Sequence, residues 1–145
     1  MSNYFIDTSA LFKRYILEEG TEKIDDIFKQ GGTFYISDIT IVEIISNLKR
    51  KNEISKELGR AVYKKIKSEF FSDIAAGNIK ISSVTSRIII EAINLIDQTY
   101  ITPLDSVQLA TALQLKAEQG DMIFICSDKK LAALAEKCGL KFLII

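Results

Sequence analysis

Five short apolar segments alternate with longer amphipathic segments along the chain. The apolar segments hold many β-branched and aromatic residues, which is typical of β-strands. They are Asn3 to Ile6, Phe34 to Ser37, Ile79 to Ser82, Met122 to Cys126 and Lys141 to Ile145. Because these runs are continuously apolar rather than alternating, we predict a parallel sheet that is covered on both faces.

Between the apolar runs, hydrophobic residues recur every three or four positions, which is the spacing of an amphipathic helix. These patterns lie within Leu11 to Ile16, Ile24 to Phe28, Ile41 to Leu48, Leu58 to Ile74, Ser86 to Gln98, Leu104 to Gln119 and Lys129 to Cys138. Strands that alternate with helices predict an α/β sandwich. At 145 residues, we expect a single domain over positions 1–145.

The amino-acid composition narrows the possible chemistry. The chain has no histidine, which excludes Ser-His-Asp triads, Cys-His pairs and histidine-ligated zinc. Cys126 and Cys138 are too far apart for a CxxC motif and too few for a disulfide framework, so we expect both to be reduced and buried. Any catalysis must therefore rest on carboxylates and hydroxyls, together with a hard metal ion.

The formal net charge is zero, so the molecule as a whole has no long-range attraction for nucleic acid. Residues 49–67 are the exception, and we call them the basic arm. Their basic residues are Lys49, Arg50, Lys51, Lys56, Arg60, Lys64, Lys65 and Lys67. No apolar segment approaches the roughly 20 residues that span a bilayer, and the N-terminal segment does not resemble a signal peptide. We expect a cytoplasmic protein without a membrane partner.

Two acidic residues follow predicted strands. Asp7 comes after the first strand and Asp128 after the fourth. Ligands of open parallel sheets bind at the carboxyl ends of strands, near the point where strand order reverses. If these strands are neighbours, the two carboxylates converge. Alternatively, each residue is only the N-cap of the helix that follows it.

Two further acids lie near the starts of predicted helices. Glu43 stands in the apolar run TIVEII, where a carboxylate needs a partner. Alternatively, Thr40 and Glu43 form a capping box. Asn47 is one turn later and either orients Glu43, contacts a ligand or is a surface residue. Asp105 lies in TPLDSVQLATAL, where its alternative role is to stabilise the helix dipole.

Taken together, the four acids predict a metal site. At about 4 Å and an effective dielectric near 20, each unscreened pair of like charges costs on the order of 4 kcal/mol, so such a cluster needs a cation. Carboxylate oxygens without histidine are the ligand set expected for Mg²⁺ or Mn²⁺.

The runs YFIDTSAL, SDITIVEIISNL, PLDSVQLATAL and FICSDKKLAALAEKCGLKFL resemble, in order and spacing, the PIN-domain proteins. The resemblance extends from about residue 4 to the C-terminus and is closest to the short VapC-like toxins. It implies a three-layer sandwich around a five-stranded parallel sheet of order 3-2-1-4-5. It also implies a metal-dependent endoribonuclease acting on single-stranded RNA, a cognate antitoxin and a homodimer.

The same resemblance assigns roles to residues. It implies that Asp7, Glu43 and Asp105 are the principal ligands of Mg²⁺ or Mn²⁺ and that Asp128 completes the acidic pocket. Thr8 and Ser9 match the hydroxyls that follow the first aspartate of the family. Two further candidate supporting positions come from their place in the chain, Asn47 one turn after Glu43 and Ser127 immediately before Asp128. Cys126 stands where family members often carry Thr or Ser.

The basic arm falls where the family places a projecting pair of helices. Its residues either hold RNA phosphates or form a solvated helix face. The candidates for RNA binding are Lys49, Arg50, Lys51, Arg60, Lys64 and Lys65.

Two other functions fit parts of the pattern. In an aspartyl phosphatase, Asp7 would be the nucleophile, but such enzymes usually have a second aspartate where this chain has Ser9. A non-catalytic α/β module would use the crevice or the projecting helices to bind a protein. Retention of all four acids favours the nuclease over this module.

Overall fold

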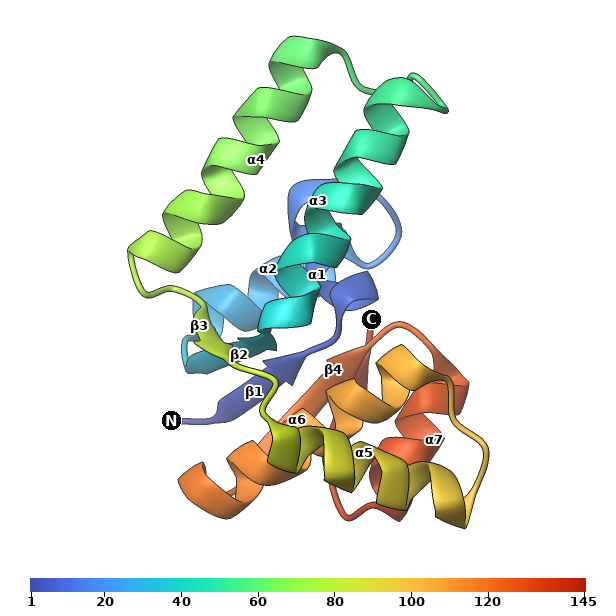
Figure 1. Cartoon of the computed structure of the whole chain (residues 1–145). Coiled ribbons are helices and arrows are strands. Elements are labelled where there is room, and N and C mark those ends of the chain that lie inside the picture. Colours follow the sequence, from blue (N-terminus) through green and yellow to red (C-terminus); the bar gives the residue numbers. More distant parts are fainter.

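The computed structural model describes residues 1–145 and confirms the five predicted strands and seven predicted helices (Figure 1). The strands are β1 (Asn3–Ile6), β2 (Thr33–Ser37), β3 (Lys80–Ser82), β4 (Met122–Cys126) and β5 (Lys141–Ile144). The helices are α1 (Thr8–Tyr15), α2 (Thr21–Gln30), α3 (Asp38–Glu53), α4 (Arg60–Ala75), α5 (Ser86–Gln98), α6 (Pro103–Gln119) and α7 (Lys129–Lys137). Several ends differ from the sequence pattern; for example, Leu58 precedes α4 but still packs against the core.

The strands form one parallel sheet in the order β3-β2-β1-β4-β5, as predicted. Phe5 of the central strand is paired with Tyr35 of β2 on one side and with Phe124 of β4 on the other. Because β1 and β4 are neighbours, the residues that follow them, Asp7 and Asp128, leave the sheet at the same edge.

Two hydrophobic cores lie on opposite faces of the sheet. Successive side chains of a strand point to opposite faces, so Phe5 belongs to one core while Tyr4 and Ile6 belong to the other. Helices α1 to α4 pack on the Tyr4 face and α5 to α7 on the Phe5 face (Figure 1). The prediction of full coverage holds for the inner strands only, because the edge strands β3 and β5 are partly exposed.

Helices α3 and α4 project together beyond the sheet, and residues 54–59 join them at the far end (Figure 1). The base of the pair is fixed to the body of the protein. Phe70 is fully buried, and the Tyr15 hydroxyl of α1 donates a 2.6 Å hydrogen bond to Asp73 of α4. The projecting pair thus has an anchored base and an exposed tip.

None of the seven helices is both long enough and apolar enough to cross a membrane.

Candidate metal centre

Asp7 lies at the end of the central strand and is 8% exposed. It occupies the N-cap position of α1, but its side chain makes no capping hydrogen bond, so capping does not explain it. Instead, Asp7 Oδ2 accepts a 2.8 Å hydrogen bond from Ser9 Oγ, and Oδ1 accepts a 3.3 Å bond from Gln108 Nε2. Its carboxylate is therefore held on both oxygens.

Burial raises the pKa of Asp7 above its usual range, and the negative charge of Asp105 raises this pKa further. The hydrogen bonds from Ser9 and Gln108 oppose the shift without reversing it. A buried carboxylate beside another acid is costly to ionise, and a cation bound there would relieve that cost.

Glu43 meets the site from α3. This helix begins at Asp38, where Ser37 Oγ accepts a 3.2 Å bond from Ile39 N–H. The capping box of Thr40 and Glu43 is therefore wrong, because Thr40 lies inside the helix rather than at its start. Glu43 Oε1 instead accepts a 2.8 Å hydrogen bond from Thr8 Oγ1 of α1. Burial raises the pKa of Glu43, as do the charges of Asp7 and Asp105, while Thr8 opposes the shift.

Asp105 reaches the site from the first turn of α6, which begins at Pro103. Its side chain is half-buried, and its charge raises the pKa of both Asp7 and Glu43. Asp7, Glu43 and Asp105 thus interact electrostatically at one edge of the sheet, although they come from three different elements.

Asp128 has a different environment. It is exposed, and its Oδ1 accepts a 3.0 Å hydrogen bond from Lys130 N–H, which confirms that it is the N-cap of α7. Its charge still acts on the Cys126 thiol, as do the charges of Asp7 and Asp105. Asp128 therefore lies at the same edge of the sheet, and its role as a metal ligand remains a prediction.

The cysteines are both free, and only Cys126 is fully buried. Burial, with the nearby acids, raises the pKa of Cys126 to about 12, which keeps its thiol protonated. Cys138 is half-buried rather than buried as predicted.

Ser127 Oγ is buried and has no hydrogen-bond partner. Asn47 lies half-buried one turn after Glu43 on α3.

The sequence pattern missed two residues of this site, Thr40 and Gln108. Thr40 is fully buried and Gln108 is 2% exposed. Gln108 Nε2 lies 3.0 Å from Thr40 Oγ1, which in turn lies 3.0 Å from Thr8 Oγ1. Buried amides require hydrogen-bond partners, so a glutamine among the apolar residues of α6, one turn after Asp105, was the available signal.

The donor atoms suit a hydrated Mg²⁺ or Mn²⁺ ion. All the candidate donors are carboxylate or hydroxyl oxygens, which these ions prefer. No group of three acidic or cysteine side chains is arranged to hold an ion jointly. Mg²⁺ usually binds through one or two carboxylates and keeps several waters, so Asp7 with Glu43 or Asp105 fits this requirement.

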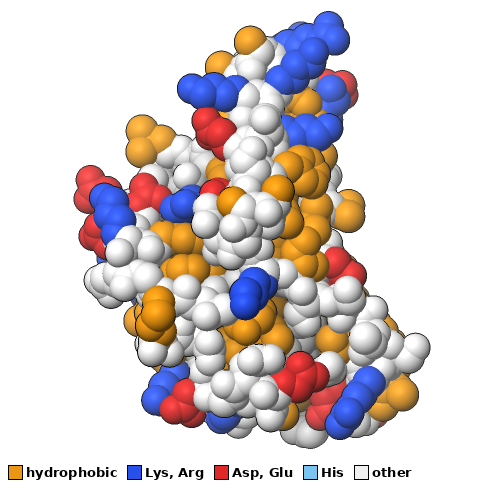
Figure 2. Space-filling view, turned by 90° about the vertical axis from the view of Figure 1, so that its left-hand side faces the viewer, with side chains coloured by type: hydrophobic (Ala, Val, Ile, Leu, Met, Phe, Trp, Pro, Cys, Tyr) orange, Lys and Arg blue, Asp and Glu red, His pale blue; other side chains and the backbone are white.

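The candidate RNA-binding residues of the basic arm fall into two groups. Lys49 pairs with Glu53 at 3.0 Å and Lys51 pairs with Glu57 at 2.7 Å. The other four are exposed and make no ion pair; they are Arg50, Arg60, Lys64 and Lys65. Figure 2 shows Lys and Arg side chains gathered over the tip of the projecting helices.

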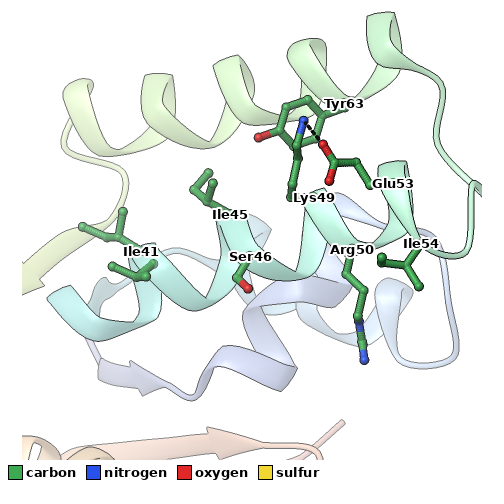
Figure 3. Close-up of a pocket in the computed structure, with 9 residues that line it drawn as sticks. Ile41, Ile45, Ser46, Lys49, Arg50, Glu53, Ile54 and Tyr63 are labelled. Atoms are coloured by element: carbon green, nitrogen blue, oxygen red, sulfur yellow. Dashed lines mark ion pairs between the residues drawn. The ribbon is translucent and has the colours of Figure 1, made fainter.

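An apolar groove of about 680 Å³ runs along α3 beside α4. Ile41 and Ile45 line it, and Lys49, Glu53 and Tyr63 lie toward its far end (Figure 3). The Lys49 ammonium group lies 5.0 Å from the centre of the Tyr63 ring. The groove therefore combines an apolar floor with a charged end.

Comparisons with solved structures agree with the fold. FitAcB from Neisseria gonorrhoeae is 13% identical, with a TM-score of 0.71 over 97% of this chain and 96% of that chain. DNA-bound VapBC from Salmonella typhimurium is also 13% identical, with a TM-score of 0.64 over 99% and 98% of the two chains. A toxin-antitoxin complex from Klebsiella pneumoniae is 17% identical, with a TM-score of 0.65 over 91% of each chain.

A comparison with curated proteins finds no sequence match. The family model described as the PIN domain matches residues 4–137. This match includes all four acids, all seven helices and strands β1 to β4 apart from Asn3. The chain therefore belongs to the PIN-domain family.

Proposed function

We propose that this protein is an endoribonuclease that hydrolyses single-stranded RNA with the help of carboxylate-held Mg²⁺ or Mn²⁺. PIN domains are generally nucleases, and the family match covers nearly the whole chain. The observation that carries the proposal is the buried Asp7 carboxylate, whose pKa is raised by burial and by Asp105. A cation at this position would balance charges that the protein leaves unbalanced.

Each acid has a proposed role in this mechanism. Asp7 and Asp105 hold the first ion, while Glu43 supports it or positions the attacking water. Thr8 and Ser9 orient the carboxylates through the 2.8 Å hydrogen bonds that they donate to Glu43 and Asp7. A divalent ion supplies Lewis acidity and neutralises charge on the reacting phosphate. Asp128 lies at the solvent side, where we propose that it recruits a second ion with the substrate.

The basic arm is the proposed RNA-binding surface. Arg50, Arg60, Lys64 and Lys65 are exposed and unpaired, so their charges are free to contact phosphates. Lys49 and Lys51 are already partnered by glutamates, and we assign them a smaller part. Phosphate contacts of this kind bind without reading sequence. With RNA as the substrate, we place the activity in the cytoplasm.

We also propose that the protein is the toxin of a toxin–antitoxin pair. Support comes from the similar fold of the Klebsiella pneumoniae toxin-antitoxin complex. The groove beside α3 offers an apolar surface for the antitoxin, since Val42 is 69% exposed and Ile54 is 75% exposed. Helix α5 exposes a second apolar surface, Ile89, Ile90 and Ile93, which we assign to a homodimer contact.

The proposal is tested by cleavage of a labelled single-stranded RNA by the wild type and by Asp7→Asn. We expect the wild type to cleave in Mn²⁺ and the variant to lose at least 100-fold in rate. Asp26→Asn is the matched control, because Asp26 is an exposed acid on α2. Full activity of Asp7→Asn would refute the carboxylate-held metal.

A further inference from the structure

A largely buried chain of hydrogen bonds joins Asp7 and Glu43, the two acids whose pKa is raised by burial. It runs from Asp7 through Gln108, Thr40 and Thr8 to Glu43. These side chains come from α1, α3 and α6, together with the end of β1. We propose that Gln108 is a positioning residue that fixes Asp7 and Glu43 relative to each other, which rests on the metal site proposed above.

The direction of the chain follows from its two acidic ends. Ionised Glu43 can only accept, so Thr8 uses its hydroxyl proton in the 2.8 Å bond to Glu43 Oε1. Thr40 must then donate its proton across the 3.0 Å contact to Thr8 Oγ1. Thr40 Oγ1 in turn accepts from Gln108 Nε2 at 3.0 Å.

The Nε2 group of Gln108 donates hydrogen bonds toward both acids, directly to Asp7 and through the threonines to Glu43. Its Nε2 group has two hydrogens, of which one reaches Thr40 at 3.0 Å and the other reaches Asp7 Oδ1 at 3.3 Å. Nε2 also lies 3.4 Å from Thr8 Oγ1, so a longer direct contact to Thr8 runs beside the link through Thr40. Reversing the amide would place its carbonyl oxygen against the Asp7 carboxylate. The orientation is therefore dictated by the acids.

The cost of this orientation is visible in the structure. Gln108 Oε1 is buried and has no hydrogen-bond partner. Buried polar atoms are normally satisfied, and native exceptions call for a specific explanation. Presenting the N–H groups to the acid network explains why this oxygen is left alone. A glutamine that served only to fill the core would not need this arrangement.

The test measures the affinity of the metal-free protein for Mn²⁺ alone, by electron paramagnetic resonance of free Mn²⁺. Gln108→Met removes the amide and keeps the length of the side chain. We expect at least tenfold weaker binding, because loss of a partner that orients a metal ligand typically costs 10- to 100-fold in affinity. Gln114→Met is the matched control, since Gln114 lies on α6 and its amide bonds only to Glu118 at an exposed position.

A double-mutant comparison separates positioning from packing. Thr40→Val removes the 3.0 Å links through Thr40 and leaves Gln108 only the longer 3.4 Å contact to Thr8, while the Gln108–Asp7 bond stays in place. If the chain acts as one unit, Gln108→Met with Thr40→Val loses no more affinity than the worse single variant. If the two substitutions caused independent packing defects, their fold losses of Mn²⁺ affinity would multiply in the double variant. Gln108→His at pH 8 restores a ring N–H at a similar distance from the backbone, and we expect it to recover most of the lost affinity.

The outcomes distinguish this inference from the proposed function. If the wild type and Gln108→Met bind Mn²⁺ with equal affinity, the proposed role of Gln108 is overturned and the proposed metal site stands. Multiplying losses in the double variant also overturn it. Absence of Mn²⁺ binding by the wild type refutes the proposed metal site and, with it, this inference.

Discussion

Replacing Asp7 with asparagine should stabilise the metal-free protein while removing its activity. The side chain is 8% exposed, so its charge is almost fully desolvated. Desolvation of a buried ion costs several kcal/mol. Hydrogen bonds from Ser9 and Gln108, at 2.8 and 3.3 Å, return about 1.5–3 kcal/mol each when they are well formed, and the longer one returns less.

Repulsion from Asp105 adds to the cost of the ionised form. Asparagine has the same shape as aspartate, keeps one accepting oxygen and carries no charge. We therefore expect a gain of about 1–2 kcal/mol in the free energy of unfolding at pH 7. For a chain of this length, about 3 °C per kcal/mol is typical, which gives a Tm increase of about 3–6 °C.

The pH dependence of this gain has a definite sign. Because the pKa of Asp7 is raised in the folded state from its ordinary value of 3.8, the folded protein binds this proton more tightly than the unfolded chain. Wild-type stability therefore falls as pH rises from 3.8 through the raised pKa. The advantage of Asp7→Asn should vanish below pH 3.8 and reach its full size above the folded-state pKa.

Thermal unfolding in EDTA, followed by circular dichroism between pH 3 and 8, measures this difference. Asp26→Asn should stay within about 0.5 kcal/mol of the wild type, as exposed substitutions usually do. A lower Tm for Asp7→Asn at pH 7, or a difference that does not change with pH, would refute the reasoning. Adding Mn²⁺ at 100 times its Kd should stabilise the wild type by about 2.7 kcal/mol and leave the variant unchanged.

Two other predictions concern the basic arm and the N-cap of α7. Charge reversal of Lys64 and Lys65 to Glu should weaken RNA binding, measured by fluorescence anisotropy. The slope of the logarithm of affinity against the logarithm of salt concentration should fall by about 0.7 for each phosphate that the arm no longer neutralises. The same reversal at the exposed Lys29 and Lys137 is the control, and equal slopes would contradict RNA binding by the arm. Asp128→Asn keeps a good N-cap residue, so its Tm should match the wild type while cleavage slows at least tenfold. Wild-type activity in this variant would show that Asp128 serves only as the N-cap of α7.

The sequence allowed the sheet and the position of the acids to be predicted, because apolar runs mark buried strands and acids follow their ends. Asp7 and Asp128 were identified on these grounds, and Asp7 is indeed buried. Glu43 was identified as a carboxylate within an apolar helical run. The Thr40 capping box was wrong because the local Thr-x-x-Glu pattern cannot show that Ser37, three residues earlier, already caps the helix. Such a pattern carries no information about where the preceding strand ends.

The contacts of Gln108 could not be predicted by spacing. Its partners Thr40 and Asp7 belong to distant elements, and only the packing of α1, α3 and α6 brings them together. The pairing of Lys49 with Glu53 fits a helical i to i+4 spacing and was open to prediction. A long-range polar network has no equivalent periodic signal.

RNA cleavage during metal removal and return tests the central claim most directly. The purified protein is stripped with EDTA, assayed on labelled single-stranded RNA, and assayed again after Mn²⁺ is added in excess. We predict that cleavage stops in EDTA, returns with Mn²⁺ and stays absent throughout in Asp7→Asn and Asp105→Asn. Cleavage that continues at the same rate in EDTA would contradict the account.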